Sequence, residues 1–263
     1  MEVYLRRGLP RMGDNKNSST SGIGSIRTGL GANKKTARVA GFLYLIIIVT
    51  AGFSEGVVRS TLIVPGDATA TANNIMASEW LFRLGFVSDL VAFSSDAVVA
   101  VLLYVLLRPV SRTLSMVAAA LRLVAHPAIA SINMLNQFIV LLLLDGGDYL
   151  TVFDTEQLHA LVLLFLNAHE YGYLIGGVFF GLHLFVLGYL LFKSELFPSI
   201  LGVLVVFAAV GYLTESFSFF LLPEYEPIAS TVVVLTAVVG EVSLMLYLLV
   251  KGVRTPKPTT EAN

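Results

Sequence analysis

The sequence predicts an all-α fold, a polytopic bundle of six transmembrane helices with both chain termini in the cytoplasm. Three observations lead to this prediction. Of the 263 residues, 56% are hydrophobic and only 13% are charged, whereas soluble domains average about 25% charged residues. The apolar residues gather in six runs, each long enough to cross the roughly 30 Å hydrocarbon core of a bilayer as a helix. Lys and Arg are concentrated on one side of these runs.

Each predicted span is a run of about 20 or more mostly apolar residues. The spans cover Ala37–Val58, Leu81–Leu107, Leu114–Leu144, Leu161–Phe192, Ser199–Leu222 and Ala229–Val250. In the third span, Pro127 lacks a backbone donor and should bend the helix. Before the fourth span, Asp154 and Gln157 have the spacing of a capping box, so we expect helix to begin well before the apolar run.

Shorter features complete the predicted bundle. The stretch PGDATATANN, residues 65–74, contains a turn and then a helix N-cap at Asp67, which predicts a short surface helix after the first span. Trp80, the only tryptophan, is expected at the headgroup level. Glycines with small-xxx-small spacing predict close helix packing in the fourth span, and two more are expected to act alike in the fifth: Gly172, Gly176, Gly177 and Gly181, then Gly202 and Gly211.

The distribution of charge orients the chain. Basic residues occupy the N-terminal tail, the second and fourth connections and the C-terminal tail: Arg6, Arg7, Arg11, Lys16, Arg27, Lys34, Lys35, Arg38, Arg108, Arg112, Lys193, Lys251, Arg254 and Lys257. The opposite connections carry Asp67, Glu79, Asp145, Asp148, Asp154, Glu156, Glu224 and Glu226. The positive-inside rule then places both termini in the cytoplasm of a multi-pass protein of the plasma (inner) membrane.

The predicted domain organisation follows from these spans. Residues 1–36 form a basic cytoplasmic tail, which we expect to be disordered because residues 13–33 are rich in Gly, Ser, Asn and Thr. Residues 37–252 form the six-helix transmembrane domain, and residues 253–263 form a second cytoplasmic tail. The net charge of −1 gives no indication of a nucleic-acid partner. The expected partners are the lipid bilayer and a small solute or ion.

Polar residues recur along one face of the third span. On a helix with about 100° per residue, five of them fall within an arc of about 100°. They are Arg122, His126, Asn133, Asn136 and Gln137. Such a stripe would cost several kcal/mol if it faced lipid. It is therefore expected to face other helices or a hydrated space.

Ionisable residues in the other spans fall at two depths. The inner cluster, a candidate substrate or proton site, contains Asp96, Arg122, His126, His183 and Glu241. The outer cluster contains Arg83, Asp89, Asn136, Gln137, His169, Glu170 and Glu215, with Glu55 and Arg59 at the same level and able to pair along the first span. We expect Arg122 to pair with Asp96 or Glu241. For the outer cluster we expect Arg83 to pair with Asp89 or Glu170.

The sequence indicates no metal site and no cofactor. His126 and His183 fall at similar depth and could ligate haem, but a matching second histidine pair for another haem is missing. The chain has no HExxH or HxxxH pair for zinc and no cysteine. It also has no P-loop, GxSxG or dinucleotide fingerprint, so we predict no enzyme class.

The chain resembles a known family in four segments that follow one another in order. They are ARVAGFLYLIIIV (37–49), EGVVRSTLIVPGDATATANNIMASEWLFRLGFVSDL (55–90), LLYVLLRPVSRTLSMVAAALRLV (102–124) and EYGYLIGGVFFGLHLFVLGYLLFKS (170–194). Over residues 37–252 it resembles the prokaryotic membrane family labelled domain of unknown function 4386. The resemblance implies a multi-pass bacterial or archaeal membrane protein with no established activity, and it carries over no catalytic residue.

Three functional hypotheses follow from the sequence. The first is a six-helix permease or channel-like carrier for a small solute or ion, which uses the inner cluster as a substrate or proton site. The second is a structural or sensory membrane component, in which the buried charges specify helix pairing. The third is an intramembrane enzyme or a haem protein.

Overall fold

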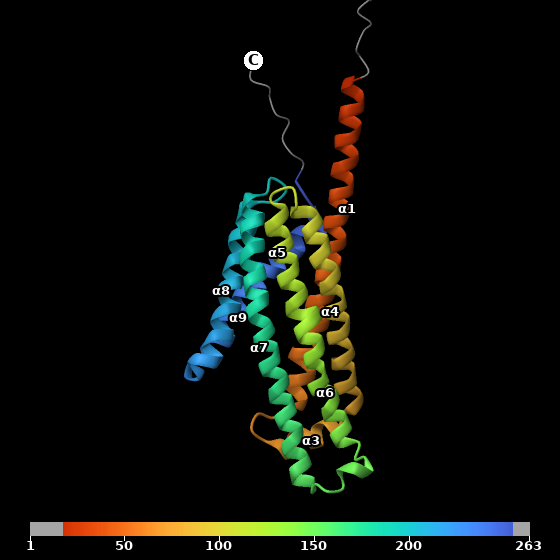
Figure 1. The fold of residues 1–263 in the computed structure, drawn as a ribbon, viewed down its shortest axis with the longest axis vertical. Helices are drawn as coiled ribbons and strands as arrows, with labels where there is room; N and C mark the ends of the chain where they lie inside the picture. Colours follow the sequence, from red (N-terminus) through yellow and green to blue (C-terminus); the bar gives the residue numbers. More distant parts are fainter. Residues whose placement is uncertain (1–17, 255–263) are drawn as a thin grey trace, which may run out of the picture.

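The computed structural model describes residues 18–254, with side chains from residue 33 onward. Every regular element in this part of the chain is helical. The elements are α1 (Ser18–Phe53), η1 (Ser54–Arg59), α2 (Ser60–Leu62), α3 (Ala68–Ala77), α4 (Glu79–Leu107), α5 (Arg112–Leu123), η2 (Val124–Ala130), α6 (Ser131–Leu144), η3 (Asp148–Leu150), α7 (Thr155–Lys193), α8 (Ser199–Leu221), η4 (Pro223–Tyr225), α9 (Glu226–Ala237), η5 (Val238–Val242), α10 (Ser243–Leu246) and η6 (Tyr247–Lys251). Figure 1 shows them as one elongated bundle.

Six continuous helical stretches within residues 18–254 are long and apolar enough to cross a membrane, as the sequence predicted. They are Asn33–Leu62, Glu79–Leu107, Arg112–Leu144, Thr155–Lys193, Ser199–Leu221 and Pro223–Lys251. α1 begins at Ser18, inside the segment that we expected to be a disordered tail. Residues 1–17 and 255–263, the remainder of the two predicted tails, lie outside the described residues.

The helix starts follow their sequence signals. The side chain of Asp67 accepts a hydrogen bond from the backbone N–H of Ala70 (2.9 Å), which begins the predicted short helix α3. The capping box before α7 is complete, because Asp154 Oδ1 accepts from the Gln157 N–H (2.8 Å) and Gln157 Oε1 accepts from the Asp154 N–H (3.1 Å). α7 then runs without interruption for 39 residues from Thr155, so helix begins well before the apolar run, as predicted.

The two ends of the bundle differ in charge. The end where α1 begins and η6 finishes (Figure 1) is here named the basic end, and among residues 33–254 it carries Lys34, Lys35, Arg38, Arg108, Arg112, Lys193, Lys251 and Arg254 against one carboxylate, Glu195. The opposite end, around α3 and η3, is named the acidic end. Arg83 is at that end, with Asp67, Glu79, Asp145, Asp148, Asp154 and Glu156.

α7 packs on five other elements, namely α8, α6, α5, η2 and α3. Its glycines permit this packing as predicted: a Cβ at Gly176 would lie 3.3 Å from the carbonyl oxygen of Ala125, and one at Gly181 would lie 2.8 Å from Leu213 Cγ. A Cβ at Gly188 would lie 2.8 Å from the carbonyl oxygen of Gly202. The glycines therefore bring η2 and α8 close to α7.

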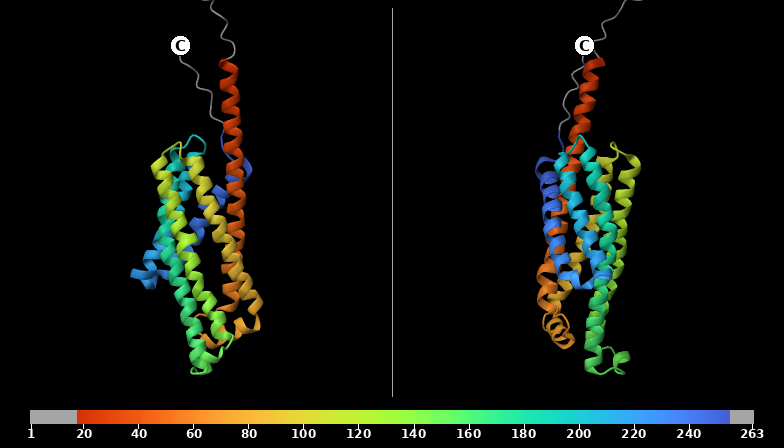
Figure 2. Two further views of the ribbon diagram at one scale, coloured as in Figure 1. Left: turned by 45° about the vertical axis from the view of Figure 1, so that its right-hand side comes forward. Right: turned by 90° about the vertical axis from the view of Figure 1, so that its left-hand side faces the viewer.

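The sixth span changes its packing partners halfway along. Its last part, α10 and η6, packs on α1, whereas its first part, α9, packs on α8 and the adjoining turns. Figure 2 shows the hairpin of α8 and α9 leaning away from the rest of the bundle at its acidic side. The first and sixth spans therefore lie against each other near the basic end and separate toward the acidic end.

Four segments of the described chain are π-helical, namely η1, η2, η5 and η6. Such turns make up well under 1% of residues in proteins and recur at functional sites. η2 contains Pro127, so the expected disturbance of the third span takes the form of a wider helical turn. η1, η2 and η5 also carry Arg59, His126 and Glu241, respectively.

Candidate functional site

The inner network is a group of seven hydrogen-bonded polar side chains in the interior of the bundle: Tyr44, Asp96, Arg122, His126, His183, Tyr212 and Glu241. At its centre, Arg122 Nη2 and Nε donate to Asp96 Oδ1 at 2.5 Å and 3.0 Å. The side chains of the pair are 0% and 1% exposed. Removing one partner of a pair buried in this way costs about 3–5 kcal/mol, because the other charge is left without compensation.

His183 and Tyr44 satisfy the rest of the Arg122 guanidinium group. Arg122 Nη1 donates to His183 Nε2 at 3.1 Å and to the Tyr44 hydroxyl at 3.4 Å. His183 Nδ1 lies 2.7 Å from the carbonyl oxygen of Ala118, so the ring carries its proton on Nδ1 and accepts at Nε2. Arg122 Cζ lies 4.7 Å from the ring centroid of Tyr44 and 5.2 Å from that of Phe180, which adds cation–π attraction.

Glu241, on η5, is the second carboxylate of the inner network. The hydroxyls of Tyr44 and Tyr212 donate to its two oxygens, each at 2.8 Å. The Tyr44 hydroxyl therefore joins Glu241 to Arg122, because it donates to the carboxylate and accepts from the guanidinium. Within residues 33–254, no lysine or arginine forms an ion pair with Glu241.

His126, on η2, lies at the other side of the network. Its Nδ1 is 3.3 Å from Asp96 Oδ2, and its ring packs on Phe180 (centroids 4.5 Å apart) and stacks on Phe93 (5.8 Å). Its side chain is 15% exposed. No described residue forms a hydrogen bond with its Nε2. His126 therefore has one ring nitrogen held by Asp96 and one that is available for a further hydrogen bond.

Exposure and charge distinguish the centre of the inner network from its two edges. Asp96 and Arg122 are fully buried, whereas Glu241 and His126 are partly exposed. Asp96 and Glu241 supply two carboxylates, but Arg122 supplies the only guanidinium of the network. One carboxylate therefore lacks a permanent positive counter-charge. A proton on His126 or a bound cation could supply this positive charge, and a proton on Glu241 would remove the need for it.

The outer network lies nearer the acidic end and repeats part of this arrangement. It consists of Ser54, Arg59, Asp89, Asn133, Asn136, Gln137 and His169. Arg59 Nη2 lies 2.5 Å from Asp89 Oδ2 and 3.1 Å from His169 Nε2, and Ser54 donates to Asp89 at 2.9 Å. With its amide oxygen turned toward Arg59, Gln137 accepts from Nη2 at 2.8 Å and from Nε at 3.1 Å.

His169 is held on its other side by α6. Asn133 Nδ2 donates to the backbone oxygen of His169 at 2.6 Å, and Asn136 Nδ2 donates to Asn133 Oδ1 at 2.9 Å. Asn133 reaches this position because residue 172 is glycine: a Cβ there would overlap its side-chain amide. The polar stripe of the third span therefore faces the other helices, as predicted.

Both networks contain an arginine, an aspartate from α4 and a histidine from α7. Asp89 and Asp96 are seven residues apart and so lie on the same face of α4. His169 and His183 are fourteen residues apart and lie on the same face of α7. Tyr173 lies between the two levels, with its ring centroid 6.0 Å from that of His126 and 6.1 Å from that of His169.

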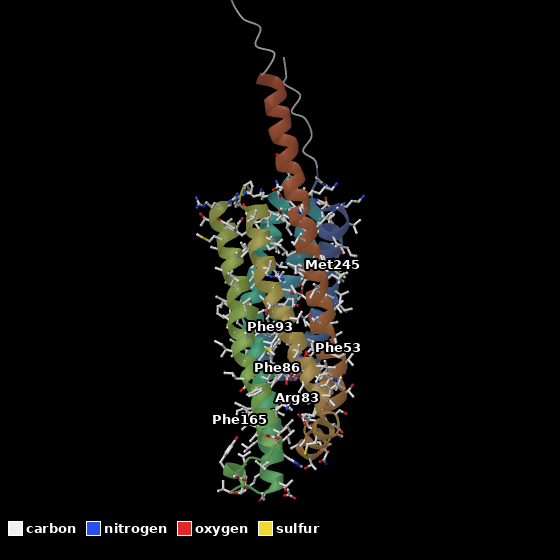
Figure 3. The ribbon with its side chains drawn as sticks, turned by 90° about the vertical axis from the view of Figure 1, so that its right-hand side faces the viewer. Phe53, Arg83, Phe86, Phe93, Phe165 and Met245 are labelled. Atoms are coloured by element: carbon white, nitrogen blue, oxygen red, sulfur yellow. The ribbon has the colours of Figure 1, made fainter. Side chains whose placement is uncertain are left out.

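The structure places three predicted outer residues apart from this network. Arg83 pairs with Glu79 (2.6 Å), and both side chains are about half exposed. The predicted pairing of Arg83 with Asp89 or Glu170 is wrong: six residues put Arg83 about 120° around α4 from Asp89, whereas Glu79 is one turn away on its own face. Figure 3 shows Arg83 closer to the acidic end of α4 than Phe93. Glu170 is exposed, and Glu215 is partly exposed without an ion pair.

The five predicted inner residues come together, and the Arg122–Asp96 pairing is confirmed. Their role as a binding site stays a prediction. Sequence reasoning missed Tyr44 and Tyr212, which are single tyrosines in apolar runs and gave no charge signal. It placed Arg59 at the right level and paired it with Glu55, as observed at 2.9 Å, but did not assign it the central position in the outer network.

Two surface hollows lie outside both networks. One, of about 420 Å³, is lined by Lys34, Lys35, Arg38, Val39 and Phe42 of α1. The other, of about 320 Å³, lies between α7 and α8 and is lined by apolar residues and glycines, including Phe185 and Phe207. Across residues 33–254, no three His, Asp or Glu side chains are grouped so that they could hold a metal ion.

Comparison with known proteins identifies the family of the chain. Residues 39–252 match the family model described as "Domain of unknown function (DUF4386)". An uncharacterised protein of Archaeoglobus fulgidus is 32% identical over 159 residues, which cover 60% of this chain and 76% of the archaeal protein. No solved structure matches. Because the family model spans nearly the whole six-helix bundle, the chain belongs to the DUF4386 family of proteins of unknown function.

Proposed function

We propose that this protein is a permease-like carrier that moves protons or a small monovalent cation across the plasma (inner) membrane. In this proposal Glu241 and His126 are the groups that bind the proton or cation. Arg122 and Asp96 form the fixed centre that couples them. The N-terminus and the C-terminus lie in the cytoplasm, in agreement with the cluster of Lys and Arg at the basic end.

The observation that carries the proposal is the unbalanced carboxylate of the inner network. Glu241 has two tyrosine hydroxyls as partners and no described lysine or arginine within ion-pair distance, and it is partly exposed inside a membrane-spanning segment. An uncompensated charge at this depth is costly in a bilayer. A proton or cation that reaches Glu241 would remove this cost, and its departure would restore it, as a transport cycle requires.

The surroundings of Glu241 and His126 support the same proposal. Both residues lie on π-helical segments, which are rare and recur at functional sites. Tyr44, Arg122 and Asp96 connect them through consecutive hydrogen bonds. A change of charge at Glu241 therefore alters the hydrogen bonding of Arg122 and, through Asp96, that of His126. We infer that the exposed parts of Glu241, Tyr212 and His126 face water.

Ion flux in proteoliposomes tests the proposal. A valinomycin-mediated potassium diffusion potential would drive protons inward, with entrapped pyranine as the reporter, and a sodium gradient with a sodium-sensitive dye would test Na⁺. We expect the wild type to pass one of these ions and Glu241→Gln to reduce that flux at least tenfold. Glu215→Gln is the matched control, because Glu215 lies in a span but outside both networks, and it should keep the wild-type rate. Wild-type flux in folded Glu241→Gln, or no flux of either H⁺ or Na⁺ in the wild type, would overturn the proposal.

A structural role is the second candidate, and the saturation of Arg122 favours it. Arg122 Nε and Nη2 donate to Asp96, and Nη1 donates to His183 and Tyr44. In the described part of the chain, the only buried polar side-chain atoms without a partner are Ser115 Oγ and Ser216 Oγ. In that case the networks only hold the helices together. Glu241→Gln would then lower thermal stability and change no flux.

A further inference from the structure

The geometry points to a binding site for an anionic phospholipid on α1 at the basic end. Lys34, Lys35 and Arg38 would hold the lipid phosphate, and an acyl chain would lie along the exposed apolar strip that begins at Val39 and Phe42. This site is separate from the inner network and does not depend on the proposed transport activity.

The first argument is the composition of the hollow. Its five lining residues lie on one face of α1, spaced at one-turn intervals from Lys34 to Phe42. Three are cations and two are apolar, and all three cations come first along the helix. Val39 and Phe42 are 42% and 55% exposed. A cationic turn followed along the helix by an apolar turn matches the headgroup and the acyl chain of an anionic phospholipid.

The second argument is length. The apolar strip continues past Phe42 to Val49, which is 59% exposed. From Lys35 to Val49, fourteen residues at about 1.5 Å each give about 21 Å. One leaflet of the hydrocarbon core is about 15 Å thick, so this distance accommodates one acyl chain and its headgroup.

The third argument is the charge and fixation of the headgroup end. Arg38 Nη2 donates to the backbone oxygen of Val250 at 3.3 Å, which ties its side chain to the end of the sixth span. Gly252, with φ +77°, lies against Lys34 and Arg38, so the end of the sixth span adjoins the same surface. Arginine and lysine together suit a phosphate group, since the guanidinium is a planar fork and the ammonium is a mobile point charge.

Native mass spectrometry of the full chain in detergent tests the site with dioleoylphosphatidylglycerol as the probe and dioleoylphosphatidylcholine as the neutral comparison. Each basic side chain at an anionic lipid surface contributes about a factor of five in affinity. Lys34→Gln/Lys35→Gln/Arg38→Gln should therefore weaken phosphatidylglycerol binding about 100-fold. The double variant Lys34→Gln/Lys35→Gln keeps the Arg38–Val250 contact and should weaken phosphatidylglycerol binding about 25-fold. It therefore still tests the site if the triple variant does not fold.

The matched control removes three exposed cations from the same end but outside the hollow: Arg108→Gln/Arg112→Gln/Lys193→Gln. It should change phosphatidylglycerol affinity less than threefold. Equal losses in the control and the test variants would overturn the site, because they would show attraction to the basic end as a whole. Equal binding of phosphatidylcholine, or competition by inorganic phosphate at matched concentration, would also overturn it.

Discussion

Replacing Asp96 by asparagine should destabilise the protein more than any other change of a single charge in the bundle. The substitution preserves side-chain volume but leaves the Arg122 guanidinium, 0% exposed, without its counter-ion. Both Nε and Nη2 of Arg122 now donate to Asp96 Oδ1, so two charge-assisted hydrogen bonds are lost or weakened. Removing one partner of a buried pair costs about 3–5 kcal/mol. For a domain of this size that corresponds to a decrease in Tm of roughly 10 °C.

The assay is thermal unfolding in detergent, compared with Glu79→Gln. That control removes the carboxylate of an exposed ion pair, Arg83–Glu79, whose side chains are 49% and 54% exposed. An exposed pair is worth about 0–1 kcal/mol, so its loss should lower Tm by no more than about 3 °C. The double variant Asp96→Leu/Arg122→Met removes both charges and should recover much of the stability that Asp96→Asn loses. Equal effects of Asp96→Asn and Glu79→Gln would contradict the burial of the pair.

Three further predictions follow from the packing and the charges. Gly172→Ala should displace Asn133 from His169 and lower the free energy of unfolding by about 1–3 kcal/mol. Gly176→Ala, whose Cβ would lie 3.3 Å from a carbonyl oxygen, should lower it less. A larger loss for Gly176→Ala than for Gly172→Ala would argue against the Asn133 contact. Arg59→Gln should lower Tm by several degrees, because Asp89 is 1% exposed, whereas Arg83→Gln should have little effect. Reporter fusions at the two termini should both report the cytoplasm, and opposite locations would exclude an even number of spans.

The helical spans could be predicted closely because one physical requirement determines them. A helix that crosses hydrocarbon needs an unbroken apolar run, and this run is a local property of the sequence. The start of α7 was also predictable, because the Asp154–Gln157 capping box is a short-range signal. Similarly, the third-span stripe could be oriented, since lipid exposure of Arg122 and Asn133 would be too costly.

The pairing of charges across helices could be predicted only in part. Asp96 and Arg122 matched in depth, and depth was sufficient to pair them. In the outer network, Arg83 and Arg59 lay at comparable depth, and the choice between them depended on the rotation of α4 and on the π turn η1. Neither feature has a local sequence signal that we could identify. Tyr44 belongs to the inner network because it contacts Arg122 and Glu241, which are 78 and 197 positions away along the chain. The sequence of a single span does not reveal such contacts.

Labelling of introduced cysteines tests most directly whether the inner network meets water. The chain contains no cysteine, so each variant reports on one position. A charged, membrane-impermeant thiol reagent applied to liposomes should label Tyr212→Cys, beside Glu241. It should not label Phe207→Cys, which is 58% exposed in the apolar hollow between α7 and α8 and which we expect to face lipid. Labelling of position 212 with none at position 207 would support a hydrated site. If position 212 reacts only after unfolding, the network is a dry seam and the proposed carrier function is wrong.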